Sequence, residues 1–343
     1  MQKSERWAGL RGSFLTGLAL GVFLLLLPLT ALGGGDGGPV AVLPASPTPA
    51  AGASSGAPSG SWDAGKTLRV LQKDGTVETL SMADYLLGVV SAEMPASFEP
   101  EALKAQAVCA RTYALCRAEG GSHAAEGADV CADSSCCQAY IAPADAAARW
   151  GAHAEEYTAR LSAAVADTDG QILTYGGSPI QAVFFSSSAG ATEDAAAVWG
   201  RALPYLVSVD SPEGDEVPNY RSSLTLSADE VKALAEEAGL GCDLSGDPAE
   251  WFSVPTRTAS GRVATLSLGG VAMTGGAARN LFSLRSASFD VAFADGAFTF
   301  SVTGYGHGVG LSQYGANAMA KEGASWRDIV KHYYTGVTVQ KGI

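Results

Sequence analysis

An uncharged, apolar run near the N-terminus constrains this 343-residue chain more than any other feature. No charged residue occurs between Gly12 and Gly35, and the centre of the run is almost entirely Leu, Ala, Val, Phe, Gly and Thr. About 20 such residues can cross the hydrocarbon core of a bilayer as a helix. Lys3, Arg6 and Arg11 precede the run and no basic residue closely follows it, which predicts a cytoplasmic N-terminus and an exported body.

A cleaved signal peptide is the alternative for the same run. Small residues around 30–33 resemble a site for a signal peptidase. The apolar region of a signal peptide is usually about 7–15 residues long, so the length of this run favours an uncleaved anchor. We therefore expect residues 1–11 in the cytoplasm and residues 12–35 as a single transmembrane anchor; the body is exported in either case.

Residues 36–65 are rich in Gly, Ala, Pro and Ser, without apolar periodicity, and predict a flexible tether. The charges of residues 1–65 cancel, because Lys3, Arg6 and Arg11 balance three acidic residues, so residues 66–343 carry the whole net charge of −13. Binding to bulk nucleic acid requires clustered cationic surface, and we expect none here. With 47% hydrophobic residues, the chain can still bury a sizeable core.

Beyond the tether, helix and strand patterns mix without a regular βα alternation, which predicts an α+β fold of helices and short antiparallel strands. Residues 66–343 are expected to form one extracytoplasmic catalytic domain, in which 214–300 is either a second subdomain or an insertion. The expected helices are 82–91, 99–117, 143–166, 227–238, 312–323 and 325–334, and the expected strands are 68–72, 76–80, 171–175, 180–185 and several between 251 and 300.

Glu93 closes an apolar helix and stands directly before a Met-Pro break. Neighbours such as Val89 and Val90 predict that the carboxyl leans toward apolar surroundings, where burial raises its pKa. A carboxyl that remains protonated near neutral pH is what general acid catalysis requires. The alternative is an ordinary helix-terminal acid facing water.

The next helix carries two cations on one face. Lys104 and Arg111 are seven residues apart, with Ala107 and Val108 between them on the same stripe. Two cations in an otherwise acidic body predict an anionic partner, either Glu93 or a carboxylate of the substrate. The alternative is a pair of solvated surface cations.

One imidazole and three thiols, those of His123, Cys131, Cys136 and Cys137, lie within fifteen residues of polar sequence. Zn²⁺ favours nitrogen and sulfur ligands of this kind. The spacing is not that of a standard zinc finger, and a disulfide network that includes Cys242 is the alternative. The adjacent Cys136 and Cys137 are expected to point in different directions, so that one of them is spare.

Two small-residue segments are candidates for binding. Four glycines surround Tyr305 and His307, which indicates a tight turn or a close approach of the backbone to a ligand. Ser187 and Ser188 follow an expected strand, and hydroxyls at such a strand end suit hydrogen bonds to a sugar. Taken alone, His307 is more typical of a structural histidine than of a catalytic one.

Four blocks of sequence together resemble the stage II sporulation protein D family. They are YLLGVVSAEMPASFEPEALKAQAVCARTYAL (85–115), CCQAYI (136–141), FFSSSAGATEDAAAVWGRALPYLVSVDSP (184–212) and GYGHGVGLSQYGANAMAKEG (304–323). The resemblance implies a membrane-anchored lytic transglycosylase of forespore engulfment, which cuts peptidoglycan strands stripped of their stem peptides. It implies as partners an engulfment amidase, stage II sporulation protein P, and its membrane recruiter, stage II sporulation protein M.

The resemblance also implies roles for individual residues. It makes Glu93 the catalytic acid, with Lys104 and Arg111 as supporting residues of the same site. It implies a zinc site formed by His123, Cys131 and Cys137.

In this chemistry one carboxylate suffices, because the 6-hydroxyl of N-acetylmuramic acid attacks its own anomeric carbon and a 1,6-anhydro ring forms. We hypothesise that Lys104 and Arg111 bind the lactyl carboxylate that peptide removal exposes. Two other readings remain. One is a non-catalytic peptidoglycan-binding module that activates a cell-wall amidase. The other is a zinc amidase built on His123 and the cysteines, which is weaker because thiol-rich zinc sites are more often structural.

Overall fold

The structure is a computed structural model that describes residues 60–342. The predicted membrane anchor, its cytoplasmic flank and most of the predicted tether lie outside the described residues. Within the described range, no helix combines the length and the apolar composition needed to cross a membrane.

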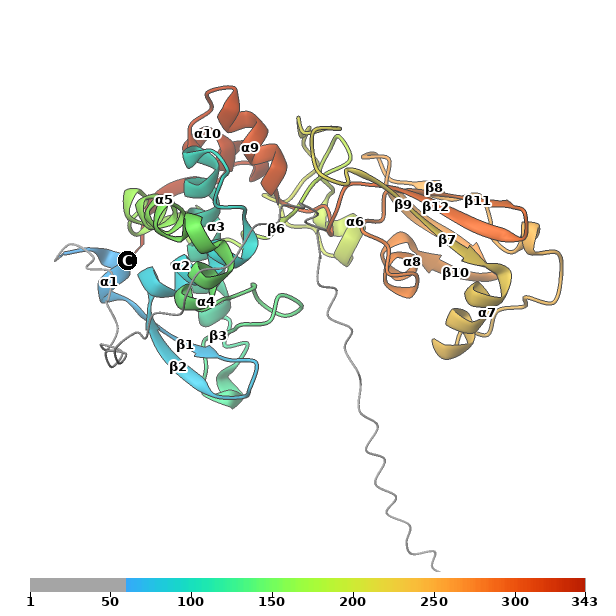
Figure 1. Ribbon diagram of the computed structural model, residues 1–343, viewed down its shortest axis with the longest axis horizontal. Helices are drawn as coiled ribbons and strands as arrows, with labels where there is room; N and C mark the ends of the chain where they lie inside the picture. Colours follow the sequence, from blue (N-terminus) through green and yellow to red (C-terminus); the bar gives the residue numbers. More distant parts are fainter. Residues whose placement is uncertain (1–59, 343) are drawn as a thin grey trace, which may run out of the picture. The chain divides into compact units, whose positions relative to one another are not determined.

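Helices dominate the first part of the described chain and return near its C-terminal end (Figure 1). The α-helices are α1 (Trp62–Gly65), α2 (Met82–Glu93), α3 (Pro100–Glu119), α4 (Pro143–Trp150), α5 (Ala154–Asp167), α6 (Ala195–Trp199), α7 (Ala228–Glu237), α8 (Gly275–Leu281), α9 (Gln313–Lys321) and α10 (Trp326–Tyr333).

The strands are short and form small sheets of two or three strands each. They are β1 (Thr67–Leu71), β2 (Val77–Ser81), β3 (Val130–Cys131), β4 (Gln171–Tyr175), β5 (Ser178–Pro179), β6 (Phe184–Phe185), β7 (Arg221–Ser227), β8 (Thr256–Arg257), β9 (Val263–Leu268), β10 (Val271–Thr274), β11 (Phe289–Ala294), β12 (Ala297–Thr303), β13 (Leu311–Ser312) and β14 (Thr338–Lys341).

The strand orders are β2-β1-β3, β14-β4-β5, β13-β6, β11-β12-β7 and β10-β9-β8. This arrangement confirms the α+β class. Most pairs are antiparallel as expected, but β1 with β3 and β6 with β13 are parallel. Each of these two pairs joins segments that are far apart in the chain, so the connection is long enough for a parallel crossover.

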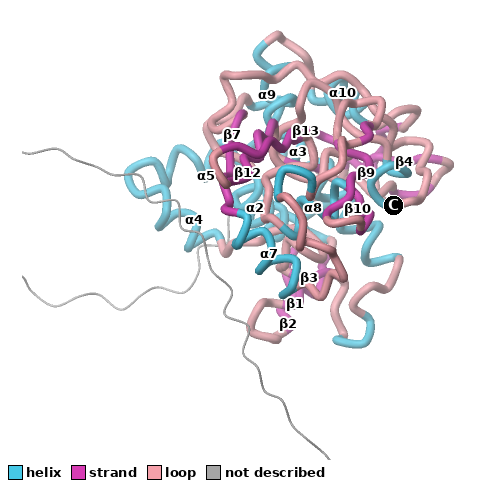
Figure 2. Tube along the Cα trace, turned by 90° about the vertical axis from the view of Figure 1, so that its right-hand side faces the viewer, coloured by secondary structure: helices cyan, strands magenta, loops and turns pink. Residues whose placement is uncertain are grey.

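Helix α3 lies within the larger hydrophobic core (Figure 2) and contacts α2, α5, α9, α10 and β4. A helix covered on several sides needs small or apolar side chains around its whole circumference. Accordingly, α3 has fully buried alanines at Ala102, Ala105, Ala107, Ala110 and Ala114. This core holds α2 in place and thereby positions the residue at its end, Glu93.

A separate hydrophobic core lies between residues 231 and 302. Strands β7, β11 and β12 pair in register, and helices α7 and α8 contribute Val231 and Ala278 to the same core. The centre is aromatic, with Phe289, Phe298 and Phe300 all at 1% exposure or less. Residues 214–300, which the sequence left open as a second subdomain or an insertion, therefore have a hydrophobic core of their own.

Several predicted boundaries agree with the structure. The hairpin forms β1 and β2, and α7 begins with a capping box in which Ser227 and Glu230 bond each other's main chain. Three predictions are wrong. The expected single helix 143–166 is divided into α4 and α5 by a 3-10 turn at Gly151–His153. Helix α1 lies inside the predicted tether 36–65, so the folded body begins before Lys66. Of the expected strand 180–185, only Phe184–Phe185 is extended in a ladder.

Candidate active site

Glu93 is the last residue of α2, and its Oε1 accepts a hydrogen bond of 2.7 Å from the main-chain N–H of Ala139. Burial raises the pKa of Glu93, while the Ala139 N–H and the Gln313 side chain oppose part of the shift. The C-terminal end of a helix dipole also disfavours a carboxylate. The direction of the pKa shift therefore agrees with the sequence prediction, and Glu93 is not simply an acid facing water.

Glu93 lines a cavity of about 440 Å³, which we call the glutamate cavity. Its walls come from α2, α3, the cysteine-containing loop, the segment before β6, helix α6 and the glycine-rich loop. The other lining residues are Tyr113, Ser134, Ser135, Cys136, Cys137, Gln138, Val183, Phe184, Trp199 and His307. Its volume lies in the range typical of ligand sites.

Two buried amide side chains near Glu93 have free polar atoms. The Nε2 of Gln138 donates to Tyr85 Oη at 3.0 Å and to the Ala110 carbonyl at 3.2 Å, but its Oε1 has no partner among the described residues. Gln313 Nε2 is buried near the Glu93 carboxyl, whose pKa it lowers, but it forms no hydrogen bond of ordinary geometry among the described residues. Buried polar groups are normally hydrogen-bonded, so free ones beside a cavity are available to a polar ligand or to water. Sequence analysis did not single out either residue, because a glutamine carries no distinctive signal.

The predicted metal cluster is assembled. One ligand atom from each of His123, Cys131, Cys136 and Cys137 lies within 4.8 Å of the others, and both Cys136 Sγ and Cys137 Sγ are 3.4 Å from His123 Nε2. In a tetrahedral zinc site with ordinary Zn–S and Zn–N distances, sulfur and nitrogen ligands are about 3.6 Å apart. The donor set and its spacing therefore fit zinc.

The expectation that Cys136 and Cys137 point in different directions was wrong, because both sulfurs lie close to His123. The N–H groups of Cys136 and Cys137 both donate to the Asp133 carbonyl, at 3.1 and 2.8 Å. This tight turn lets neighbouring residues converge on one point. All six cysteines are free thiols, and Cys242 packs against the second hydrophobic core, so a disulfide network with Cys242 does not form in this structure.

The structure does not bring Lys104 and Arg111 to the glutamate cavity. Lys104 Nζ pairs with Glu101 at 2.9 Å and with Asp167 at 3.0 Å. Arg111 is fully buried and forms a two-pronged ion pair with Asp63, at 2.7 and 2.5 Å. The two cations do share a helix face and do have anionic partners, as their spacing predicted, but those partners are carboxylates of the protein itself. Neither side chain is free for a substrate carboxylate.

Ser187 and Ser188 are also withdrawn from the surface, at 1% and 0% exposure. The main chain of Ser187 exchanges hydrogen bonds of 3.0 and 2.8 Å with that of Tyr305. The N–H of Ser188 donates to Glu213 Oε1 at 2.6 Å, and its hydroxyl accepts from the Gly190 N–H. The predicted sugar contacts of these two serines are not possible, because the glycine-rich loop covers them.

His307 lines the glutamate cavity, but both of its ring nitrogens are engaged by the backbone. Nε2 lies 3.0 Å from the Phe184 carbonyl, and Nδ1 accepts from the Val309 N–H at 3.2 Å, which fixes the neutral tautomer protonated at Nε2. Burial lowers the pKa of His307 to about 4. His307 therefore shapes the cavity wall. Tyr305 is 43% exposed and its ring lies under the Arg285 guanidinium, outside the cavity lining.

Trp199 is a cavity residue that sequence analysis did not single out. It ends the short helix α6, which Asp194 caps at the N-terminus and Gly200 ends with a φ of +72°. Its ring lies 5.3 Å from that of His307 and is 47% exposed, which is unusual for a tryptophan. The available signal was a lone tryptophan next to glycine in an otherwise small-residue segment.

Comparison with known proteins adds to this geometry. A family model described as SpoIID, stage II sporulation protein, matches residues 72–175. The chain is 41% identical over 268 residues to the stage II sporulation protein D of Bacillus amyloliquefaciens, which covers 78% of this chain and 76% of that protein. The protein of that name from Bacillus subtilis (strain 168) gives the same identity and coverage. An amidase enhancer from Bacillus subtilis is 29% identical over 312 residues, covering 74% of this chain and 40% of that protein.

Proposed function

The chain belongs to the stage II sporulation protein D family, and from this premise we propose that it is a peptidoglycan lytic transglycosylase acting on denuded glycan strands. The observation that carries the proposal is a half-buried carboxyl with a raised pKa, Glu93, at the wall of a cavity large enough for a sugar. We place its role in septal and forespore engulfment during sporulation.

In the proposed reaction, protonated Glu93 donates its proton to the glycosidic oxygen as the bond to the anomeric carbon breaks. The 6-hydroxyl of the same N-acetylmuramic acid then attacks that carbon, and the Glu93 carboxylate takes the hydroxyl proton. The products are a new chain end and a 1,6-anhydro end, and Glu93 is protonated again. The Ala139 N–H holds one carboxyl oxygen throughout, which leaves the other to face the substrate.

A zinc ion bound by His123, Cys131, Cys136 and Cys137 would supply a structural cross-link. Four protein ligands close a tetrahedral site and leave no open position for a reacting group. The cysteine turn leads directly into the Ala139 N–H that holds Glu93, so the cluster would position the acid. A closed site also argues against the zinc amidase alternative.

We expect stoichiometric zinc in the full-length protein purified without chelator. The substitutions Cys136→Ser and Cys137→Ser should each lower zinc affinity by more than about 100-fold and lower the melting temperature. The matched control is Cys242→Ser, which removes a free thiol outside the cluster. Metal analysis and thermal melts measure both effects, and normal zinc content in both cluster variants would exclude the site.

Trp199 is proposed as a platform on which a sugar ring of the strand stacks. Because the ring is exposed, Trp199→Ala should leave folding unchanged and weaken binding of denuded glycan by roughly tenfold. Tyr175→Ala is the control, since Tyr175 is 41% exposed and lies outside the glutamate cavity. Equal weakening by both substitutions, measured by calorimetry, would remove Trp199 from the site.

The proposed setting is a single-pass membrane protein anchored by residues 12–35, with its catalytic domain outside the cell. Proposed partners are the glycan strands, the engulfment amidase named stage II sporulation protein P, and the membrane protein named stage II sporulation protein M. Nucleic acid is not among the proposed partners.

The second candidate function is a non-catalytic module that binds peptidoglycan and activates an amidase. Its support is the similarity to a protein named amidase enhancer. Incubation of the full-length protein with denuded glycan separates the two functions. Mass spectrometry should find 1,6-anhydro ends if the chain is the enzyme, whereas an activator leaves the strands intact and increases peptide release only when an amidase is present.

A further inference from the structure

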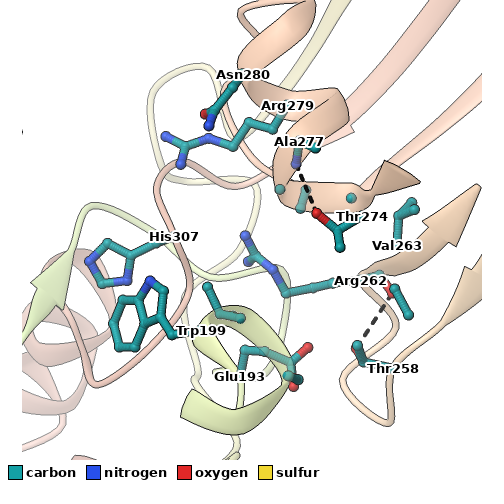
Figure 3. Close-up of a pocket in the computed structure, with 16 residues that line it drawn as sticks. Glu193, Trp199, Thr258, Arg262, Val263, Thr274, Ala277, Arg279, Asn280 and His307 are labelled. Carbon is teal, nitrogen blue, oxygen red and sulfur yellow. Dashed lines mark hydrogen bonds between the residues drawn. The ribbon is translucent and has the colours of Figure 1, made fainter. Parts of the chain in front are cut away.

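A second hollow, of about 390 Å³, adjoins the glutamate cavity. Trp199 and His307 line both, so the two spaces share a wall. Figure 3 shows Arg262 and Arg279 extending into this second space, with Glu193 below Arg262. We call it the arginine hollow.

Arg262 is a buried cation that forms no ion pair with the described residues, although the charge of Glu193 nearby raises its pKa somewhat. It is only 3% exposed, and one guanidinium nitrogen, Nη2, donates to the Gly306 carbonyl at 2.9 Å. The other, Nη1, is buried and has no hydrogen-bond partner among residues 60–342. No carboxylate of the described residues lies within ion-pair distance of Arg262. Burying an uncompensated charge is costly, so the arrangement is typical of a site that an external anion completes.

Arg279 reaches the same space from helix α8 (Figure 3). Its Nε donates to the Leu284 carbonyl at 3.3 Å, and its guanidinium forms no ion pair within the described part of the chain. Burial lowers the pKa of Arg279 and brings that of Arg262 to about 10, which leaves both charged at neutral pH. His307 is neutral there, because its pKa is about 4.

Glu193 does not neutralise the pair. Its carboxylate oxygens accept hydrogen bonds from Ser260 Oγ at 2.6 Å and from the Asp194 N–H at 2.9 Å. With two arginines and one glutamate, the hollow keeps a net positive charge within a domain that is acidic overall.

The glycine-rich loop is shaped to hold Arg262 in this position. Gly308 has a φ of +88°, and a Cβ added there would lie 2.5 Å from Arg262 Nη1. Only glycine permits this backbone conformation next to the guanidinium. The loop that places His307 on the shared wall therefore also places Arg262 in the arginine hollow.

We propose that Arg262 and Arg279 bind the lactyl carboxylate of a muramic acid residue next to the one positioned at Glu93. The inference rests on the proposed function and deepens it, because it makes this pair the element that selects glycan freed of peptide. A guanidinium presents two parallel N–H donors that match the two oxygens of a carboxylate. A stem peptide would convert that carboxylate to an amide and remove its charge.

The test measures binding rather than turnover. Full-length protein carrying Glu93→Gln is titrated calorimetrically with a denuded tetrasaccharide and with the same tetrasaccharide whose lactyl carboxylates are converted to primary amides. We expect the acid form to bind about tenfold more tightly. Arg279→Gln should bring the ratio of the affinities for the acid and the amide close to one. The same is expected of Arg262→Lys, which retains the charge but not the paired N–H donors of the guanidinium. Lys232→Gln, an equal loss of charge on exposed helix α7, should leave the ratio unchanged.

Thermal melts confirm that each variant is folded. Arg279 is only partly buried, so Arg279→Gln provides the test if Arg262→Lys fails to fold. Equal binding of the acid and the amide by the parent protein overturns the inference, and so does a preference that persists in the folded arginine variants. The titration does not depend on cleavage, so a failure of the proposed function, seen as an absence of anhydro ends, is distinguishable from a failure of this inference.

Discussion

Replacing Glu93 by Gln is expected to reduce the rate of glycan cleavage by at least about 10²–10⁴-fold. Glutamine keeps the size of the side chain and can still accept the Ala139 hydrogen bond, but it cannot donate a proton to a leaving oxygen. Substrate binding should change little, so the loss should fall on kcat rather than on KM. Steady-state assays on denuded glycan measure both parameters.

The raised pKa of Glu93 also predicts how the rate of cleavage depends on pH. As a general acid, Glu93 acts in its protonated form, so kcat/KM should fall as pH rises through its folded-state pKa. The direction in which pH changes the stability of the fold follows from the same pKa shift of Glu93. The unfolded chain ionises Glu93 at a lower pH than the folded chain does, so the group destabilises the fold increasingly as pH rises between these two pKa values.

Glu93→Gln should therefore be at least as stable as the parent protein at neutral pH, although it is inactive. Glu119→Gln, at the exposed end of α3, is the control for loss of one acidic charge and should leave cleavage and stability unchanged. A Glu93→Gln protein that cleaves denuded glycan at the parent rate would remove the carboxyl from the mechanism.

Arg111→Ala is expected to destabilise the folded protein by about 3–5 kcal/mol. The substitution leaves Asp63, which is 1% exposed, as a buried charge without its partner. It also removes the N–H donors to the main-chain carbonyls of Gln171 and Val165, so contacts of α1, α5 and β4 are lost together. Chemical denaturation measures the free energy of unfolding.

Lys104→Ala is the comparison for Arg111→Ala. Lys104 is 20% exposed and its pairs with Glu101 and Asp167 reach solvent, so we expect a loss of no more than about 1 kcal/mol. A double-mutant cycle of Arg111→Ala with Asp63→Ala should show coupling, because Asp63→Ala removes the buried carboxylate that Arg111→Ala leaves without a partner. Unchanged stability of Arg111→Ala together with weakened glycan binding would restore the role in substrate binding that we hypothesised from the sequence.

Features that depend on residues close together in the chain were predicted best. Helix α7 begins where we expected it, because its capping residues Ser227 and Glu230 lie within four residues of chain. The raised pKa of Glu93 followed from the apolar residues just before it, and the cluster of one histidine and three cysteines followed from their spacing within fifteen residues. Each of these features is encoded in a short segment, so a single sequence suffices to find it.

Features that depend on distant segments were missed. Helical spacing correctly placed Lys104 and Arg111 on one face, but the anion that binds Arg111 is Asp63, 48 residues earlier and inside the predicted tether. Nothing in the local sequence indicates that pairing. Trp199 and Arg262 likewise share a hollow only because of tertiary packing, and a single arginine after a glycine carries no pattern.

The segment between β5 and β7 was the least predictable part of the described chain. Loops make up most of it, and its only regular elements are the short β6 and α6. Its hydrogen bonds run to remote groups, as when the Gln181 N–H donates to Tyr205 Oη and Ser188 bonds Glu213. Periodicity cannot reveal such contacts, and the serines therefore looked accessible when they are buried.

We propose that this chain cuts glycan by intramolecular attack under the control of Glu93. The most direct measurement is the mass of the new chain ends after the full-length protein acts on denuded glycan. We predict ends lighter by one water than ordinary reducing ends, in the parent protein and not in Glu93→Gln. Ordinary reducing ends, or intact strands from folded parent protein, would contradict it.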